Sequence, residues 1–242
     1  MAGPVPEAAV VVDIEGTTTP VAFVYDVLFP FARRHVRAFL ARRGQEPEVR
    51  ADLGLLRAEH AAESGAPVPP PPWPDSDGPL DAATAYVHWL MDRDRKSTAL
   101  KALQGRLWEE GYRTGELLSE VYEDVPPAFS RWHGRGCGPW IFSSGSVLAQ
   151  RLLFAHTRAG DLTLLVRGHF DTTTGPKRDA ATYGRIAAAI GQPPADVLFV
   201  SDVTAELDAA GAAGLRTAWC VRDGPPPADP PHPVIRTFDE LP

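Results

Sequence analysis

The stretch AAVVVDIEG, Ala8–Gly16, decides the fold of this chain. Its first five residues form an unbroken apolar run, which Asp13 and Gly16 end abruptly. This pattern is typical of a strand in the middle of a parallel sheet, because helices cover both faces of such a strand and neither face meets water. The sequence therefore predicts that residues 8–12 form a central parallel strand with a carboxylate at its end.

Later parts of the chain repeat this pattern in alternation with helical patterns. The further strands are predicted at Pro139–Phe142, Val197–Val200 and Arg216–Val221, with Leu162–Val166 as a fourth candidate. The helices are predicted at Val147–His156, Asp179–Ile190 and Ala205–Ala213. Strands that alternate with helices favour right-handed crossovers, so we predict an α/β protein with a Rossmann-like parallel sheet.

Residues 24–135 interrupt the alternation. They are rich in Leu, Ala, Arg and Glu, and apolar residues recur with a helical period from Val27 to Leu40 and again from Ala82 to Leu118. We predict an α-helical cap domain over residues 24–135, inserted into a core domain of residues 1–23 and 136–242. Within the insert, the prolines of Gly65–Pro79 predict a surface loop, with a proline-motif ligand as the weaker alternative.

Composition limits the classes of function. Of the 242 residues, 44% are hydrophobic and 23% are charged, which is typical of a globular protein, and the net charge of −7 argues against a general nucleic-acid binder. The first residues lack a basic segment and a long apolar run, so we expect no signal peptide, no membrane span and a cytoplasmic protein. The two cysteines, Cys137 and Cys220, are interpreted as buried thiols, with a disulfide as the alternative.

Polar residues gather where the predicted strands end. They are Asp13 and Glu15 after the first strand, Ser143 and Ser144 in FSSGS, Lys177 before a helix, and Asp202 in VLFVSD. Ligands of open α/β sheets bind at the carboxyl ends of the strands. Each residue alone has an ordinary structural interpretation, such as a turn former, a helix cap or a solvated lysine. Their convergence on one edge favours a functional site.

These residue types suit the hydrolysis of a phosphate ester. Asp13 is the candidate nucleophile, which would form an aspartyl-phosphate. Mg²⁺ binds oxygen ligands and is usually held by one or two carboxylates plus the phosphate, which Asp13 and Asp202 would supply. Glu15 would protonate the leaving oxygen and then activate water. Ser143 or Ser144 would donate hydrogen bonds to the phosphate oxygens, and Lys177 would add a positive charge.

At these residues the chain resembles the haloacid dehalogenase-like hydrolases. The longer string DIEGTTTPVAFVYDVLFPF, Asp13–Phe31, is similar to the enolase-phosphatase family of methionine salvage. The segments that agree further are DRKSTALKALQG (Asp94–Gly105), FSSGSVLAQRLLFAHT (Phe142–Thr157), GHFDT (Gly168–Thr172) and LFVSDVTAE (Leu198–Glu206). The resemblance is weaker in the first residues, in the proline-rich loop and over residues 223–242. Pro176, directly before Lys177, departs from the relatives.

This resemblance implies a monomeric, Mg²⁺-dependent enzyme that acts on 2,3-diketo-5-methylthiopentyl-1-phosphate. The substrate would be enolised and then dephosphorylated to the acireductone 1,2-dihydroxy-3-keto-5-methylthiopentene. Carried over by motif, Asp13 and Glu15 are catalytic; Asp13, Glu15 and Asp202 are the metal residues; Ser143, Ser144 and Lys177 bind substrate. Most phosphatases of the superfamily have Asp two residues after the nucleophile, and the enolase-phosphatase family shares the Glu15 of this chain.

Several points stay open at the level of sequence. Glu15 and His169 are both candidate bases for the enolisation, and a structural role is the more common one for such a histidine. Four aromatic residues of the segment after the first strand are candidates for an apolar substrate surface, although core packing is the more common fate: Phe23, Phe29, Trp89 and Trp108.

Three rival functions remain. The nearest is a haloacid dehalogenase-like phosphatase for another small phosphate ester. A receiver-type signalling module is disfavoured because its phosphorylated Asp follows the third strand and it has no cap. A haloacid dehalogenase is disfavoured because it would need neither Mg²⁺ nor Glu15.

Overall fold

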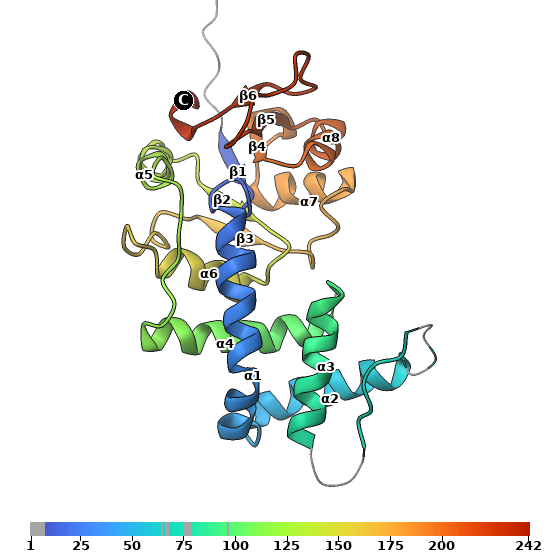
Figure 1. Ribbon diagram of the computed structural model, residues 1–242. Helices are drawn as coiled ribbons and strands as arrows, with labels where there is room; N and C mark the ends of the chain where they lie inside the picture. Colours follow the sequence, from blue (N-terminus) through green and yellow to red (C-terminus); the bar gives the residue numbers. More distant parts are fainter. Residues whose placement is uncertain (1–7, 64, 66–67, 75–78, 96) are drawn as a thin grey trace, which may run out of the picture. The chain divides into compact units, whose positions relative to one another are not determined.

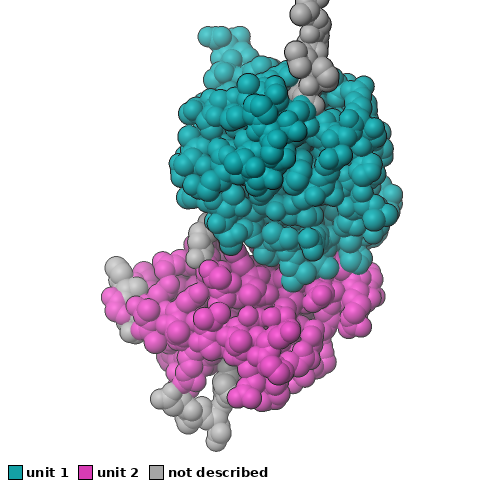
Figure 2. Space-filling model, turned by 180° about the vertical axis from the view of Figure 1, so that it is seen from behind, with its two compact units in different colours: residues 1–24, 118–242 teal, residues 25–117 magenta. Residues whose placement is uncertain are grey.

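The structure is a computed structural model that describes residues 8–63, 65, 68–74, 79–95 and 97–242. The chain folds as two compact units, drawn in different colours in Figure 2. One unit contains residues up to Val24 together with Leu118–Pro242, and the other contains Tyr25–Leu117. The first is called the sheet unit and the second the helical unit.

The elements follow one another as Figure 1 labels them. The strands are β1 (Ala9–Val12), β2 (Trp140–Phe142), β3 (Gly168–Phe170), β4 (Val197–Ser201), β5 (Arg216–Cys220) and β6 (Val234–Ile235). The α-helices are α1 (Phe29–Arg43), α2 (Pro47–Ala62), α3 (Pro79–Asp92), α4 (Thr98–Thr114), α5 (Val125–Arg135), α6 (Val147–Ala155), α7 (Ala180–Ile190) and α8 (Thr204–Ala212). A π-helix, η1 (Phe23–Leu28), and the short 3-10 helices η2 (Pro194–Asp196) and η3 (Phe238–Glu240) complete the described elements.

The sheet is parallel and has β1 near its middle. Its six strands lie in the order β3-β2-β1-β4-β5-β6, and β1 pairs with β2 on one side and β4 on the other. All four residues of β1 and all five of β4 are buried. This confirms the predicted Rossmann-like sheet and the central position of the first apolar run.

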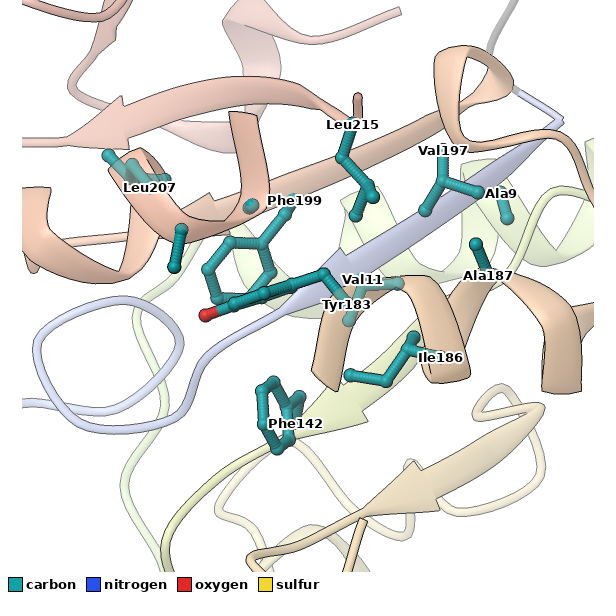
Figure 3. Packing of buried hydrophobic residues seen from close by; sticks show 12 residues of the cluster. Ala9, Val11, Phe142, Tyr183, Ile186, Ala187, Val197, Phe199, Leu207 and Leu215 are labelled. Atoms are coloured by element: carbon teal, nitrogen blue, oxygen red, sulfur yellow. The ribbon is translucent and has the colours of Figure 1, made fainter. Parts of the chain in front are cut away.

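Helices cover both faces of the sheet (Figure 1). Right-handed crossovers place α5 and α6 on one face, and α7 and α8 on the other. Figure 3 shows the core under α7 and α8, where Val11 of β1 and Phe199 of β4 meet Tyr183 and Ile186 of α7. Val10 points to the opposite face and is also buried, as the alternation of side chains along a strand requires.

The helical unit is built from α1 to α4, in which α1 packs on α3 and α4, and α2 packs on α4. Its core includes Val36, Phe39 and Leu56, each with 0% exposure. Residues 65 and 68–74 of the proline-rich loop form neither helix nor strand, and the carbonyl of Pro71 lies 2.7 Å from His60 Nε2. Pro79 was predicted as the last residue of this loop, but it begins α3. Proline is accepted there because it lacks an N–H group and the first turn of a helix does not need one.

Two sequence predictions are corrected. Leu162–Val166 is not a strand, and the strand at that edge of the sheet is β3 instead. Asp161 Oδ1 accepts hydrogen bonds from Thr163 N and Oγ1 at 2.8 and 2.6 Å, and these bonds form a turn. The helical insert was predicted to continue to residue 135, but residues 118–135 cluster with the sheet unit. The reason is packing, since Phe129 of α5 contacts Phe154 with ring centroids 5.6 Å apart.

Both cysteines are buried thiols, as the sequence predicted, and burial raises the pKa of Cys220 to about 12. Among the described residues, every helix is too short or too polar to cross a bilayer. The monomeric state and the cytoplasmic location stay predictions.

Candidate active site

The polar residues that the sequence singled out lie at the carboxyl edge of the sheet. Asp13 follows β1, Ser143 follows β2, and Asp202 follows β4. Because β1 pairs in parallel with both β2 and β4, these three strand ends are neighbours. Lys177 lies in the turn before α7 rather than in the helix itself.

A buried lysine lies between two carboxylates. Lys177 Nζ is 2.7 Å from Asp13 Oδ2 and 2.7 Å from Glu206 Oε2, and all three side chains are nearly enclosed. Burial alone would lower the pKa of Lys177, but the Asp13 and Glu206 charges outweigh it and raise this pKa. Burial, and then the Asp13 charge, raise the pKa of Glu206 to about 7. The arrangement holds a permanent positive charge beside Asp13.

The core of the sheet unit positions this lysine. The Tyr183 hydroxyl donates a 2.7 Å hydrogen bond to the carbonyl of Lys177. The Tyr183 ring packs against Phe142 and Phe199, with centroids 5.7 and 5.0 Å away (Figure 3). The apolar packing of α7 on the sheet therefore determines where the ammonium group lies.

Glu15 and Ser143 meet across the edge between β1 and β2. Ser143 Oγ donates to Glu15 Oε2 at 3.3 Å and accepts from Gly145 N at 3.1 Å. Burial, and then the Asp13 charge, raise the pKa of Glu15. A carboxyl group that is held toward its protonated form is suited to donate a proton.

Ser144 follows on the same loop, three residues before the first residue of α6, and it is exposed. Ser146 caps this helix by accepting from Ala149 N at 3.3 Å. The first N–H groups of a helix favour anions, so this loop presents donors of the kind that bind phosphate.

Asp202 lies close to the turn after β1. A Cβ atom at Gly16 would overlap its Oδ2, and Oδ1 is buried without a hydrogen-bond partner among the described residues. Burial, and then the Asp13 charge, raise the pKa of Asp202 to about 6, with a smaller contribution from Glu15. An orphaned carboxylate oxygen beside other carboxylates is the kind of group that a cation satisfies.

These donors fit Mg²⁺. The described residues do not bring three or more His, Cys, Asp or Glu side chains together as a complete metal site. Mg²⁺ does not need one, because it keeps several waters and is usually held by one or two carboxylates together with the substrate phosphate. Asp13 and Asp202 offer those carboxylates, and Glu15 lies near them.

Replacement of Gly16 with alanine tests the approach of this turn to Asp202. Gly16 has φ of +72°, which costs about 1–2 kcal/mol for an L-residue, and the new Cβ also displaces the Asp202 carboxylate. We expect Gly16→Ala to raise the half-saturating Mg²⁺ concentration by about tenfold or more. Gly115→Ala is the matched control, since its φ is +75° and its Cβ would meet open space. Equal Mg²⁺ requirements in the two variants would contradict the assignment.

Sequence reasoning missed two residues of this cluster. Glu206 was interpreted only as part of a helix start, although it lies in the first turn of the helix that follows Asp202. Ser201 was given no role, yet its hydroxyl lies 3.2 Å from Asp13 Oδ2 and 3.1 Å from Glu206 Oε2. The position of Ser201 directly before Asp202 was the available signal.

His169, one of the two candidate bases, lies outside the cluster. Its Nδ1 is 3.1 Å from Gln150 Oε1, and burial, helped by the Arg151 charge, lowers its pKa to about 4. Its ring lines a pocket of about 390 Å³ along α6 and β3, and none of the six predicted site residues lines that pocket.

Comparisons with known proteins identify the family of the chain. A family model described as haloacid dehalogenase-like hydrolase matches residues 7–214. The chain is 53% identical over 239 residues to the Enolase-phosphatase E1 of Synechococcus elongatus, and the aligned region covers 98% of this chain and 99% of that protein. It is 49% identical over 237 residues to the protein of the same name from Sorangium cellulosum, with 98% and 97% covered. The crystal structure of the Saccharomyces cerevisiae UTR4 protein matches with a TM-score of 0.78 and 30% identity, over 97% of this chain and 100% of that one.

Proposed function

Because the chain belongs to the haloacid dehalogenase-like hydrolase family and, within it, to the enolase-phosphatase E1 family, we propose that its substrate is 2,3-diketo-5-methylthiopentyl-1-phosphate. Family membership makes the chain a phosphatase, and the proposal adds the substrate, the mechanism and Mg²⁺. The enzyme enolises the diketone and then removes the phosphate, which yields an acireductone in methionine salvage. The observation that carries the chemistry is the buried Lys177 between Asp13 and Glu206 at the sheet edge.

In the phosphatase step, Asp13 attacks phosphorus. A bond forms between an Asp13 carboxylate oxygen and phosphorus while the ester P–O bond breaks, and Glu15 gives its proton to the leaving oxygen. Glu15 then takes a proton from water, whose oxygen attacks phosphorus and releases Asp13. Lys177 offsets the negative charge of the phosphoryl group, and the Ser143–Ser144 loop donates hydrogen bonds to its oxygens. Bound at Asp13, Glu15 and Asp202, Mg²⁺ would neutralise and orient the phosphate.

For the enolisation, the geometry favours Glu15 over His169 as the base. Glu15 contacts Ser143 within the cluster, whereas His169 lines the separate pocket along α6. When Glu15 removes the proton from carbon, the carbonyl oxygen that becomes the enol hydroxyl takes a proton from solvent, and the protonated Glu15 is the acid that the phosphatase step needs next.

The helical unit is proposed as the cap that recognises the non-phosphate end of the substrate. Phe23 and Trp108 are buried, and Trp108 Nε1 donates to the carbonyl of Leu28 at 2.9 Å, so both pack in the protein interior. Phe29 and Trp89 are only partly buried and remain candidates for contact with a methylthio chain.

The test is incubation with the diketo phosphate and Mg²⁺, with the enol followed by absorbance and phosphate release followed in parallel. We expect the enol to appear before phosphate. A panel of other phosphate esters separates the rival, a family phosphatase for a different small ester. A clear preference for a sugar phosphate would overturn the proposed substrate.

Substitution of Asp202 with asparagine tests the proposed metal site. The amide removes one anionic ligand, so we expect a half-saturating Mg²⁺ concentration about 10- to 100-fold higher and a lower rate. Asp208→Asn, in the helix α8 that follows Asp202, is the matched control, because Asp208 is exposed and lies 3.1 Å from His232 instead. An unchanged Mg²⁺ titration of the Asp202 variant would remove Asp202 from the metal site.

A further inference from the structure

Arg222 forms a buried clamp on the turn that carries Glu15. It follows β5, and its side chain is 7% exposed. Its Nε and Nη2 donate to the carbonyl of Thr17 at 3.0 and 2.6 Å. Its Nη1 donates to both carboxylate oxygens of Asp124 at 2.9 and 2.7 Å, and to the carbonyl of Arg236 at 3.1 Å.

Aromatic rings and main-chain bonds complete the clamp. The guanidinium carbon lies 4.2 Å from the centroid of Tyr122 and 4.8 Å from that of Phe238. Phe238 N donates to Asp124 Oδ2 at 2.5 Å, and Tyr122 N donates to the carbonyl of Thr18 at 3.0 Å. Four distant segments of the sheet unit therefore meet at one cation. A buried cation is costly unless it is fully paired, and this one is paired with the turn after β1.

The clamped turn is closed by its own hydrogen bonds and is buried, so its position sets that of the catalytic carboxylate. The turn is closed by Gly16 N, which donates to Thr19 O, and by Thr17 N, which donates to Ile14 O. Thr17, Thr18 and Thr19 are all 0% exposed. Glu15 and Gly16 lie inside this closed turn, where Glu15 contacts Ser143 and Gly16 approaches Asp202. A shift of the Thr17 carbonyl would carry both residues with it.

We propose that Arg222 and Asp124 are a positioning pair for the reaction, which holds the Thr17 carbonyl so that Glu15 reaches the leaving oxygen. The pair acts through the turn, without a contact of its own to Asp13, Glu15 or Lys177 among the interactions described. The proposal rests on the proposed function, because it uses the acid and base role of Glu15. A displacement of about 1 Å at a catalytic group lowers a rate by about 100-fold.

The chemistry of arginine explains the residue type. The planar guanidinium reaches the Thr17 carbonyl on one edge and the Asp124 carboxylate on another, and it stacks on aromatic rings. Lysine carries the charge but has a single nitrogen, so it can keep the ion pair while it loses the fixed orientation of the carbonyl.

The experiment is a double-mutant cycle with Arg222→Met and Glu15→Gln. It measures kcat and KM for phosphate release at saturating Mg²⁺, at a temperature well below the Tm of each variant. We expect Arg222→Met alone to lower kcat by about 100-fold with KM changed far less, and Arg222→Lys to lose less. In the Glu15→Gln background, Arg222→Met should cost almost nothing more, because residues that act as a unit are not additive. Asp124→Asn, which keeps Arg222, should show the same non-additivity.

Arg106→Met is the matched control, since Arg106 also holds two acidic partners, Asp52 and Glu48 at 2.7 Å each, but in the helical unit. It should lower Tm and leave kcat unchanged. A lower Tm with wild-type kcat in Arg222→Met and Asp124→Asn, or losses that multiply in the cycle, would overturn the positioning role. The proposed substrate fails separately, if the wild type releases no phosphate from the diketo ester; the cycle then runs on p-nitrophenyl phosphate.

Discussion

Asp13→Asn is expected to abolish phosphate release while the protein stays folded. The amide oxygen is a far weaker nucleophile than the carboxylate, so turnover should fall by about a thousandfold or more. The two side chains have the same shape, and Lys177 keeps its 2.7 Å contact with Glu206. The check is steady-state phosphate release beside a thermal melt of the same sample.

The control must remove a buried aspartate charge elsewhere. Asp52 serves, because it is 7% exposed and its Oδ2 accepts from Arg106 Nε at 2.7 Å in the helical unit. Asp52→Asn should lower Tm without a change in kcat for the folded enzyme. Near-normal turnover in Asp13→Asn would show that the nucleophile is misassigned.

The parallel sheet could be predicted because its strands carry their own signal. Val10 to Val12 and Val197 to Val200 are apolar throughout, since each has helices on both faces. Strand β3 lies at the edge of the sheet and its three residues are only partly buried, so its sequence is not an unbroken apolar run. A strand was therefore predicted at the more apolar segment Leu162–Val166 instead. That segment turns because Asp161 binds Thr163 locally, a preference that apolar periodicity does not report.

Some residues of the candidate site could likewise be located from the sequence, and others could not. Residues directly at strand ends, such as Asp13 and Asp202, could be located because strand ends share one edge. Glu206 could not be given its place beside Lys177, since that contact depends on how α7 and α8 lie against the sheet. Arg222 was not singled out, because its acceptors, the Thr17 carbonyl and Asp124, are distant in the chain.

The largest effect on stability is expected from Lys177→Met. The variant leaves the Asp13 and Glu206 carboxylates buried together without their cation, and loss of one partner from a buried ion pair costs about 3–5 kcal/mol. Turnover should also fall by about 100- to 1,000-fold, because the positive charge beside the phosphoryl group is gone. Thermal melts and phosphate release measure the two losses separately.

The stability loss of Lys177→Met should depend on pH with a definite sign. Without the ammonium, burial and the nearby Asp13 charge hold the folded pKa of Glu206 above its unfolded value; in the wild type this pKa is already raised to about 7. The folded variant then binds more protons than the unfolded one, so its stability is greatest at low pH and is lost as pH rises. Melts in a chelator at about pH 6 and pH 8 should therefore show a larger deficit at the higher pH.

The double variant Lys177→Met/Glu206→Gln separates stability from catalysis. Glutamine removes one of the two uncompensated charges while it keeps a hydrogen-bonding group near Ser201, whose hydroxyl lies 3.1 Å from Glu206 Oε2. Most of the stability and most of its pH dependence should return, because the Asp13 carboxylate no longer faces the Glu206 charge. Activity should stay low, because the cation that offsets the phosphoryl charge is still missing. If the double variant regained turnover together with Tm, Lys177 would serve the fold alone, and the electrostatic role assigned to it at the sheet edge would be wrong.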